Sequence, residues 1–190
     1  MARGIRWGVA HAFRRGPSSI DLHWHVLHQD RSRFFDTLAW AHAVPLPGAD
    51  GANVSALSPT EHLMHICLHG LRHDASANRI WPLDAVRIVD YPRVDINWER
   101  LVRSARERCL SVALLDALRF LGTLTERVPA RVLEQLAAEP ASSLELLEYR
   151  AITSRWRDVE PRARAASLQM AELRRRFEKL SPDVLRAAVG

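Results

Sequence analysis

The stretch Ile20-Asp21-Leu22-His23-Trp24-His25-Val26-Leu27 decides how the first part of this chain folds. Side chains alternate between the two faces of a β-strand. The apolar residues of this segment therefore fall on one face, and Asp21, His23 and His25 fall on the other. The pattern predicts a strand with one face against a core. Its other face bears a carboxylate and two imidazoles, groups that bind metal ions or transfer protons.

The segments around this stretch predict a β-hairpin followed by helices. Residues 5–13 are rich in apolar side chains, and the Gly- and Pro-containing segment 14–19 separates them from the strand at 20–27. Beyond the hairpin, apolar residues recur with the spacing of helices. Helices are predicted at 32–44, 58–73, 81–90, 97–108 and 110–126, two more are set off by Pro129 and Pro140, and a short strand is expected near Val54.

The chain is therefore predicted to have an α+β fold, an N-terminal β-hairpin followed by a mostly helical domain. Three parts are expected: a β element and helix at 1–45, a helical domain at 46–140, and an Arg-rich helical extension at 141–190. Charges balance through residue 149, so the whole net charge of +5 arises from residues 150–190.

Composition restricts the class of protein. A hydrophobic content of 47% is that of a globular protein, and no apolar run is long enough to span a membrane. Arg3 and Arg6 are not followed by the apolar stretch of a secretory signal. Cys67 and Cys109 are interpreted as small buried hydrophobic residues in a reducing compartment, so a cytoplasmic location is expected.

The helix predicted at 58–73 begins with a clear signal. Ser58, Pro59 and Glu61 form the pattern of a capping box with proline at the first helical position. Four histidines follow on one face, within roughly an 80° arc. They are His62, His65, His69 and His73, and they lie opposite Met64, Cys67, Leu68 and Leu71.

The histidine face has two interpretations. His65 and His69 have the i, i+4 spacing of a metal-binding pair, but Ile66 stands where the zincin pattern requires its catalytic glutamate. The histidines therefore serve either as structural side chains or as contacts to a metal ion or phosphate. Gly70 beside His69 would permit close approach of another backbone, and Asp84 is a candidate carboxylate partner that fixes a histidine tautomer.

Four short motifs together carry a family resemblance. They are Asp21-Leu22-His23-Trp24, His65-Ile66-Cys67-Leu68-His69-Gly70-Leu71-Arg72, Trp81-Pro82-Leu83-Asp84-Ala85 and Ile96-Asn97-Trp98. In this order and with this spacing, the set resembles the uncharacterised bacterial nucleotidyltransferase-like family of the polymerase-β-like nucleotidyltransferase superfamily. The resemblance runs from about Val9 to Pro129 and leaves residues 141–190 outside.

The resemblance implies Mg²⁺-assisted transfer of a nucleotide from an NTP to an acceptor. Asp21 matches the third carboxylate of the family's metal site, with His23 beside it as a second catalytic candidate. His69 and Asp84 are the candidate cofactor-binding residues, with bracing of the helical domain against the strand as their alternative role. In this comparison the hairpin is the remaining part of a nucleotidyltransferase sheet.

The sequence departs from the family pattern before Asp21. Neither the Gly-Ser turn nor the Asp-x-Asp pair occurs there, and Asp95-Ile96-Asn97 lacks the second carboxylate. A lone Asp21 cannot hold two Mg²⁺ ions, so this chain is expected to be inactive by itself. Three explanations are open: a late gene start, a separate chain that carries the first half, or a degenerate remnant that binds without catalysis. Exposed apolar surface on the hairpin would favour the first two.

A basic segment near the C-terminus offers the alternative function. Residues 171–180 form a predicted amphipathic helix with Arg174, Arg175, Arg176 and Lys179 on one side. A nucleic acid or an anionic membrane could bind there, or the helix could dock with a solvated charged face. The alternative to catalysis is thus a helical binding module. Four tryptophans, Trp24, Trp40, Trp81 and Trp98, are expected to pack between elements.

Overall fold

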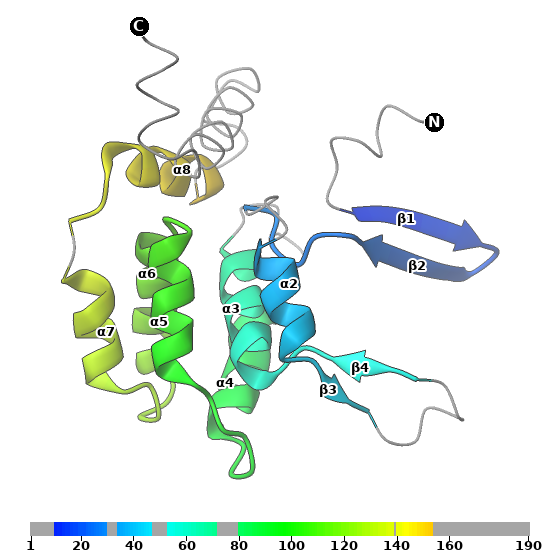
Figure 1. Cartoon of the computed structure of the whole chain (residues 1–190), viewed down its shortest axis with the longest axis horizontal. Helices are drawn as coiled ribbons and strands as arrows, with labels where there is room; N and C mark the ends of the chain where they lie inside the picture. The colour runs from blue at the N-terminus through cyan, green and yellow to red at the C-terminus, as the bar shows by residue number, and fades with distance from the viewer. Residues whose placement is uncertain (1–9, 30–33, 47–52, 72–79, 139, 154–190) are drawn as a thin grey trace, which may run out of the picture.

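The computed structural model describes residues 10–29, 34–46, 53–71, 80–138 and 140–153. The described strands are β1 (Ala10–Arg15), β2 (Ser18–His23), β3 (Val44–Pro45) and β4 (Ser55–Ala56). The described helices are α2 (Phe34–Ala41), α3 (Pro59–Gly70), α4 (Trp81–Asp90), α5 (Trp98–Glu107), α6 (Ser111–Gly122), α7 (Ala130–Ala137) and α8 (Ser143–Thr153). The predicted α+β fold, a hairpin followed by a mostly helical body, is confirmed (Figure 1). Residues 5–9, His73 and the basic helix predicted at 171–180 lie outside the described residues.

The hairpin differs from the prediction at its turn, which is shorter, and at the end of its second strand. Strands β1 and β2 pair antiparallel, with Phe13 opposite Ile20, and only Gly16 and Pro17 connect them. Gly16 has a φ of 60°, a conformation that favours glycine at the first central position of a two-residue turn. Ile20 and Leu22 share a face as predicted, but that face is not in the core, because Ile20 is 69% and Leu22 55% exposed. The prediction of a buried apolar face was wrong.

The predicted strand at 20–27 ends at His23 because the chain turns into the helical body. Leu27 is buried in the hydrophobic core. The Asp36 carboxylate of α2 accepts the backbone N–H of Val26 at 2.8 Å and contacts Nδ1 of His25 at 2.7 Å. His25 therefore does not share a strand face with Asp21 and His23. If the strand had continued to Leu27, this segment would not have reached its partners in α2 and in the core.

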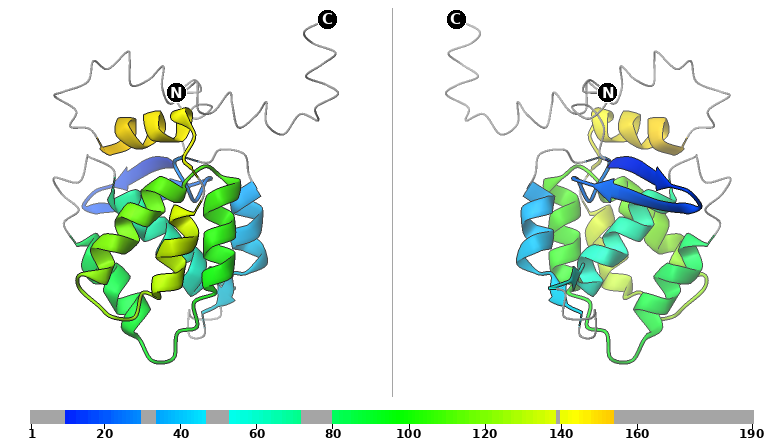
Figure 2. Two further views of the ribbon diagram at one scale, coloured as in Figure 1. Left: turned by 90° about the vertical axis from the view of Figure 1, so that its left-hand side faces the viewer. Right: turned by 90° about the vertical axis from the view of Figure 1, so that its right-hand side faces the viewer.

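Helix α3 lies at the centre of the body, against α4, α5 and α6 (Figures 1 and 2). Its predicted apolar face is confirmed, since Met64, Cys67 and Leu68 are buried and Leu71 is half-buried. Burial raises the pKa of the Cys67 thiol to about 12, so Cys67 packs as a neutral side chain. Cys109 is less buried than predicted. It lies half-buried between α5 and α6, with a φ of 54°.

The start of α3 differs in detail from the predicted capping box. The helix begins at Pro59, but the Ser58 side chain does not cap a backbone N–H. Ser58 instead donates to the Glu61 carboxylate. Arg100 of α5 donates to Oε1 of Glu61 at 2.8 Å and to the Ser58 hydroxyl at 3.2 Å. Glu61 is only 1% exposed, so it serves as a buried anion that joins α3 to α5.

Two further predictions concern packing near α3. Trp81 and Trp98 pack against the core as expected, whereas Trp40 is 77% exposed, so its predicted packing role was wrong. The close approach at Gly70 is made by the indole ring of Trp81 and not by a backbone, because a Cβ at Gly70 would lie 2.2 Å from Trp81 Cγ. Gly70 thus allows the end of α3 to pack directly on α4.

A short ribbon connects α2 to α3. The strand expected near Val54 is found as β4, one residue further on. It pairs with β3, which was not predicted, and the N–H of Leu46 donates to the carbonyl of Val54 at 2.9 Å. The ribbon lies at the end of α2 (Figure 1).

Helix α8 is tied to α6 by two side chains. Glu145 accepts the backbone N–H of Val112 at 2.9 Å, and the Tyr149 hydroxyl donates to Asp116 at 2.8 Å. Burial and the bond to Asp116 raise the pKa of Tyr149 to about 12, so its hydroxyl remains a donor. The division of the chain at residues 140 and 141 stays a prediction. Among the described helices, none has the length and apolar character required to cross a membrane.

We expect Arg100→Met to destabilise the protein because Glu61 would be left as a buried, uncompensated charge. Loss of one partner from a buried ion pair costs about 3–5 kcal/mol. The free energy of unfolding in urea measures this loss. Arg103→Met, on the exposed face of the same helix, is the matched control. An equal loss in both variants would contradict a structural role for the Glu61–Arg100 pair.

We expect Gly70→Ala and Gly122→Ala to differ in the sign of their effect. The new Cβ at Gly70 would displace the Trp81 ring, whereas a Cβ at Gly122 meets open space. Overpacking costs about 1–3 kcal/mol, while replacing a helical glycine by alanine gains up to about 1 kcal/mol. Urea denaturation of the two variants compares them, and a stabilised Gly70→Ala protein would contradict the close packing of α3 on α4.

Candidate functional site

The predicted catalytic residues lie together on one face of the hairpin. His23 Nε2 and Asp21 Oδ2 are 3.1 Å apart, and both side chains are exposed. Across the hairpin, Ala12 lies opposite Asp21 and Ala10 lies opposite His23. These small neighbours leave the carboxylate and the imidazole accessible from the side. The face is therefore open to a ligand or to another polypeptide.

The three polar residues predicted to share one strand face lie in two different parts of the structure. Asp21 and His23 remain on the hairpin, while His25 pairs with Asp36 in the body. Asp36 was missed in the sequence, although a carboxylate beside Phe35 in an apolar helix pattern is a signal of a buried partner. The pair fixes the segment that leaves β2 and so determines where the hairpin lies.

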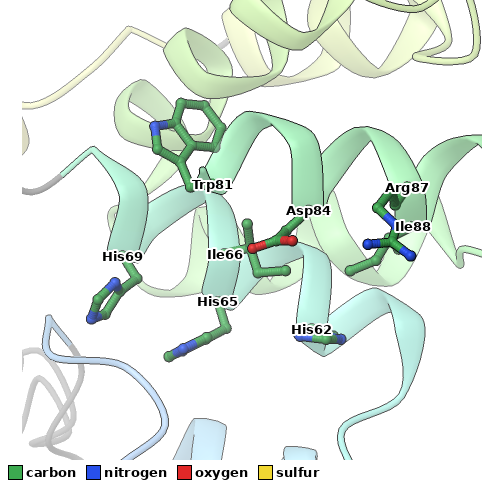
Figure 3. A pocket seen from close by; sticks show the side chains of 8 residues that line it. All are labelled: His62, His65, Ile66, His69, Trp81, Asp84, Arg87 and Ile88. Atoms are coloured by element: carbon green, nitrogen blue, oxygen red, sulfur yellow. The ribbon is translucent and has the colours of Figure 1, made fainter. Parts of the chain in front are cut away.

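The second candidate region is a pocket of about 500 Å³ between α3 and α4 (Figure 3). His62, His65 and His69 line it from α3, as their predicted common face requires. Asp84 and Arg87 line it from α4, with Trp81, Ile66 and Ile88 as the apolar part of its wall. The structure thus places the predicted cofactor-binding residues His69 and Asp84 in the same pocket. His73, the fourth histidine of the predicted face, lies outside the described residues.

Hydrogen bonding defines the tautomer of His65. Its Nδ1 lies 2.8 Å from the carbonyl oxygen of Val26, so Nδ1 carries the proton and Nε2 carries the lone pair. Burial lowers the pKa of His65 to about 4. The bond to Val26 opposes this shift, and the nearby charges of His69, His62 and His23 add to it. His65 is therefore neutral near pH 7.

Asp84 acts electrostatically on His62. Partial burial lowers the pKa of His62, and the negative charge of Asp84 opposes this shift. The tautomer of a histidine is indeed fixed in this pocket, but the group that fixes it is the Val26 carbonyl on His65. Asp84 contributes electrostatically to the part of the pocket nearest His62.

The hairpin site and the pocket lie within electrostatic reach of each other. The charge of His23, at the end of β2, acts on His65 of α3. Val26, in the segment that follows β2, bonds His65 of the pocket through its carbonyl. A ligand that contacts the Asp21–His23 face would therefore lie close to the histidine face of α3.

The described residues do not by themselves fit a site for two Mg²⁺ ions. Magnesium prefers carboxylate and other oxygen ligands, and Asp21 offers one such group on the hairpin. Within the described ranges, no three His, Cys, Asp or Glu side chains converge closely enough to enclose an ion. Further oxygen ligands would have to come from residues beyond those described.

The lowered pKa of His65 predicts a pH dependence of stability. The folded pKa of about 4 lies below the ordinary value of 6.5, so the unfolded chain takes up the proton first as pH falls. Stability from this group is fully present above pH 6.5 and is lost between pH 6.5 and about 4. The free energy of unfolding cannot change by more than about 1.4 kcal/mol per pH unit through the uptake of one proton.

His65→Asn tests this pH dependence. The asparagine amide can still donate to the Val26 carbonyl, but it does not titrate. We expect a shallower loss of stability from pH 7 to pH 5 in this variant, measured by urea denaturation in the presence of EDTA. Identical slopes in the variant and the native protein would show that His65 is not the group responsible.

Comparison with protein families identifies one match. Residues 8–126 match the family described as "Uncharacterised nucleotidyltransferase". The matched range includes the hairpin, α2 and the histidine face of α3. Comparisons with curated proteins and with solved structures gave no match. Because the match covers more than half of the 190 residues, the chain belongs to this uncharacterised nucleotidyltransferase family.

Proposed function

We propose that this chain contributes Asp21 to the Mg²⁺ site of an enzyme that transfers a nucleotide from an NTP to an acceptor. The observation that carries the proposal is the open carboxylate of Asp21 on β2, inside the segment that matches the nucleotidyltransferase family. When bound, Mg²⁺ would stabilise negative charge on the transferred phosphate. Asp21 would serve as one of its oxygen ligands.

His23 supports Asp21 in this proposal. Its Nε2 lies 3.1 Å from the carboxylate, so the ring can hold the orientation of Asp21 and leave the second carboxylate oxygen for a ligand. His69 and Asp84 would act from the neighbouring pocket, where they could contact the NTP or acceptor.

The remaining metal-binding carboxylates would come from a second polypeptide segment. The apolar face of the hairpin supports this part of the proposal, since Phe13, Ile20 and Leu22 are all more than half exposed. A two-stranded ribbon also has unpaired backbone groups along both edges, where another strand can add. The chain by itself would then lack activity, and the assembled protein would be active.

The test uses the protein expressed from its own gene together with the adjacent upstream DNA. Mg²⁺-dependent incorporation of α-labelled NTPs into co-purified protein, RNA or small molecules is measured. We expect Asp21→Asn to reduce labelling at least about a hundredfold, because metal stabilisation of the transition state is worth several kcal/mol. His23→Gln should cause a smaller loss.

Asp95→Asn is the matched control, since Asp95 is an exposed carboxylate in the loop before α5. It should leave labelling unchanged. Equal labelling by the Asp21→Asn and native proteins would refute a metal-binding role for Asp21. Labelling by the 190-residue chain alone would refute the need for a second segment.

A further inference from the structure

Two histidines of α3 are placed to share one ligand. His65 and His69 are one helical turn apart, and their ring centroids are separated by 5.4 Å with a tilt of 33°. Both rings project from the same side of the helix (Figure 3). Imidazoles at i and i+4 can direct one nitrogen each to a common cation, because they lie on one face of a helix.

The hydrogen bond at His65 presents its second nitrogen as an acceptor. Nδ1 is 2.8 Å from the Val26 carbonyl, so the lone pair is on Nε2. Histidines that bind metal ions generally use their other N–H in this way, which fixes the ring and raises its basicity as a ligand.

A small cavity lies directly beside the two rings. It has a volume of about 10 Å³ and is lined by Val26, Leu27, His28, Gln29, His65 and His69. This volume corresponds to about one water-sized species. The walls are held in place, because Leu27 is buried and the Gln29 amide donates to the Leu68 carbonyl at 3.3 Å. The space beside the two rings is therefore the size of a single ion or water.

We propose that His65 and His69 bind one divalent transition-metal ion of the zinc, cobalt or nickel type. Imidazole nitrogen suits these ions, whereas Mg²⁺ and Ca²⁺ prefer oxygen. No third protein ligand converges with the pair in the described part of the chain, so water completes the coordination. The site is separate from the one proposed at Asp21, because carboxylates are absent among the residues that line the small cavity.

The wider pocket gives this ion access to a ligand. His65 and His69 line both the small cavity and the pocket between α3 and α4. An ion held by two protein nitrogens keeps open positions for water or an anionic group. Arg87, on the α4 side of the pocket, would favour an anion there.

The test is direct metal binding to the full chain. After removal of metals with EDTA, Zn²⁺ is titrated by calorimetry and Co²⁺ by its visible absorption, in excess Mg²⁺ and without NTP. We expect a site for one ion per chain and at least about tenfold weaker Zn²⁺ binding by His69→Gln. The His69 side chain is exposed, so this variant should fold like the native protein. Zn²⁺ should raise the Tm of the native protein more than that of His69→Gln at the same metal concentration.

His62→Gln is the matched control. His62 lies on the same helix and lines the wider pocket but not the small cavity, so this variant should keep the native affinity. Absence of binding, or native affinity in His69→Gln, would overturn the proposal, and the second result would place the ion at other histidines. Because no nucleotide is present, these outcomes are independent of whether Asp21 supports nucleotide transfer.

Discussion

The Asp36 carboxylate determines how the hairpin is positioned relative to the helical body. It accepts the backbone N–H of Val26 and contacts the ring nitrogen Nδ1 of His25. Both residues lie just after the end of the hairpin. The carbonyl of Val26 then binds His65, so one residue is fixed from both α2 and α3. A carboxylate that is mostly removed from water requires such partners. The direction in which the hairpin leaves the body follows from satisfying that requirement.

Helix α3 connects this anchor to the rest of the fold. One face is buried against neighbouring helices, and the opposite face carries the histidines. Its first turn is joined to α5 by the Glu61–Arg100 pair, and its last residue, Gly70, lies against Trp81 of α4. Each end thus has a tight contact with a different helix. This double attachment fixes the position of the histidine face relative to α4 and α5.

The fold separates two kinds of chemistry. The hairpin presents an oxygen ligand, Asp21, on an open surface, whereas α3 presents nitrogen ligands beside a small cavity. Oxygen and nitrogen ligands select different cations. His23 lies close enough to influence His65 electrostatically, so the two regions are neighbours. The family match, over residues 8–126, covers both regions.

Local pattern in the sequence determined where most helices lie and that a hairpin comes first. Helix α4 was predicted with its observed bounds, and α5 begins after the capping residue Asn97. Both features are local, because capping and apolar spacing depend on residues within a turn or two. The sequence also placed His62, His65 and His69 on one face, since helical geometry is regular. The hairpin turn was marked by Gly16 and Pro17.

Only the tertiary structure decided which faces are buried and which polar groups meet. Ile20 and Leu22 alternate correctly but remain exposed, because burial depends on whether another element covers that face. Arg100, which pairs with Glu61, and Val26, which bonds His65, each lie 39 residues from their partner, beyond the reach of any local pattern. For the same reason, the end of β2 and the pairing of His25 with Asp36 required the folded chain, since both follow from contacts between separate elements.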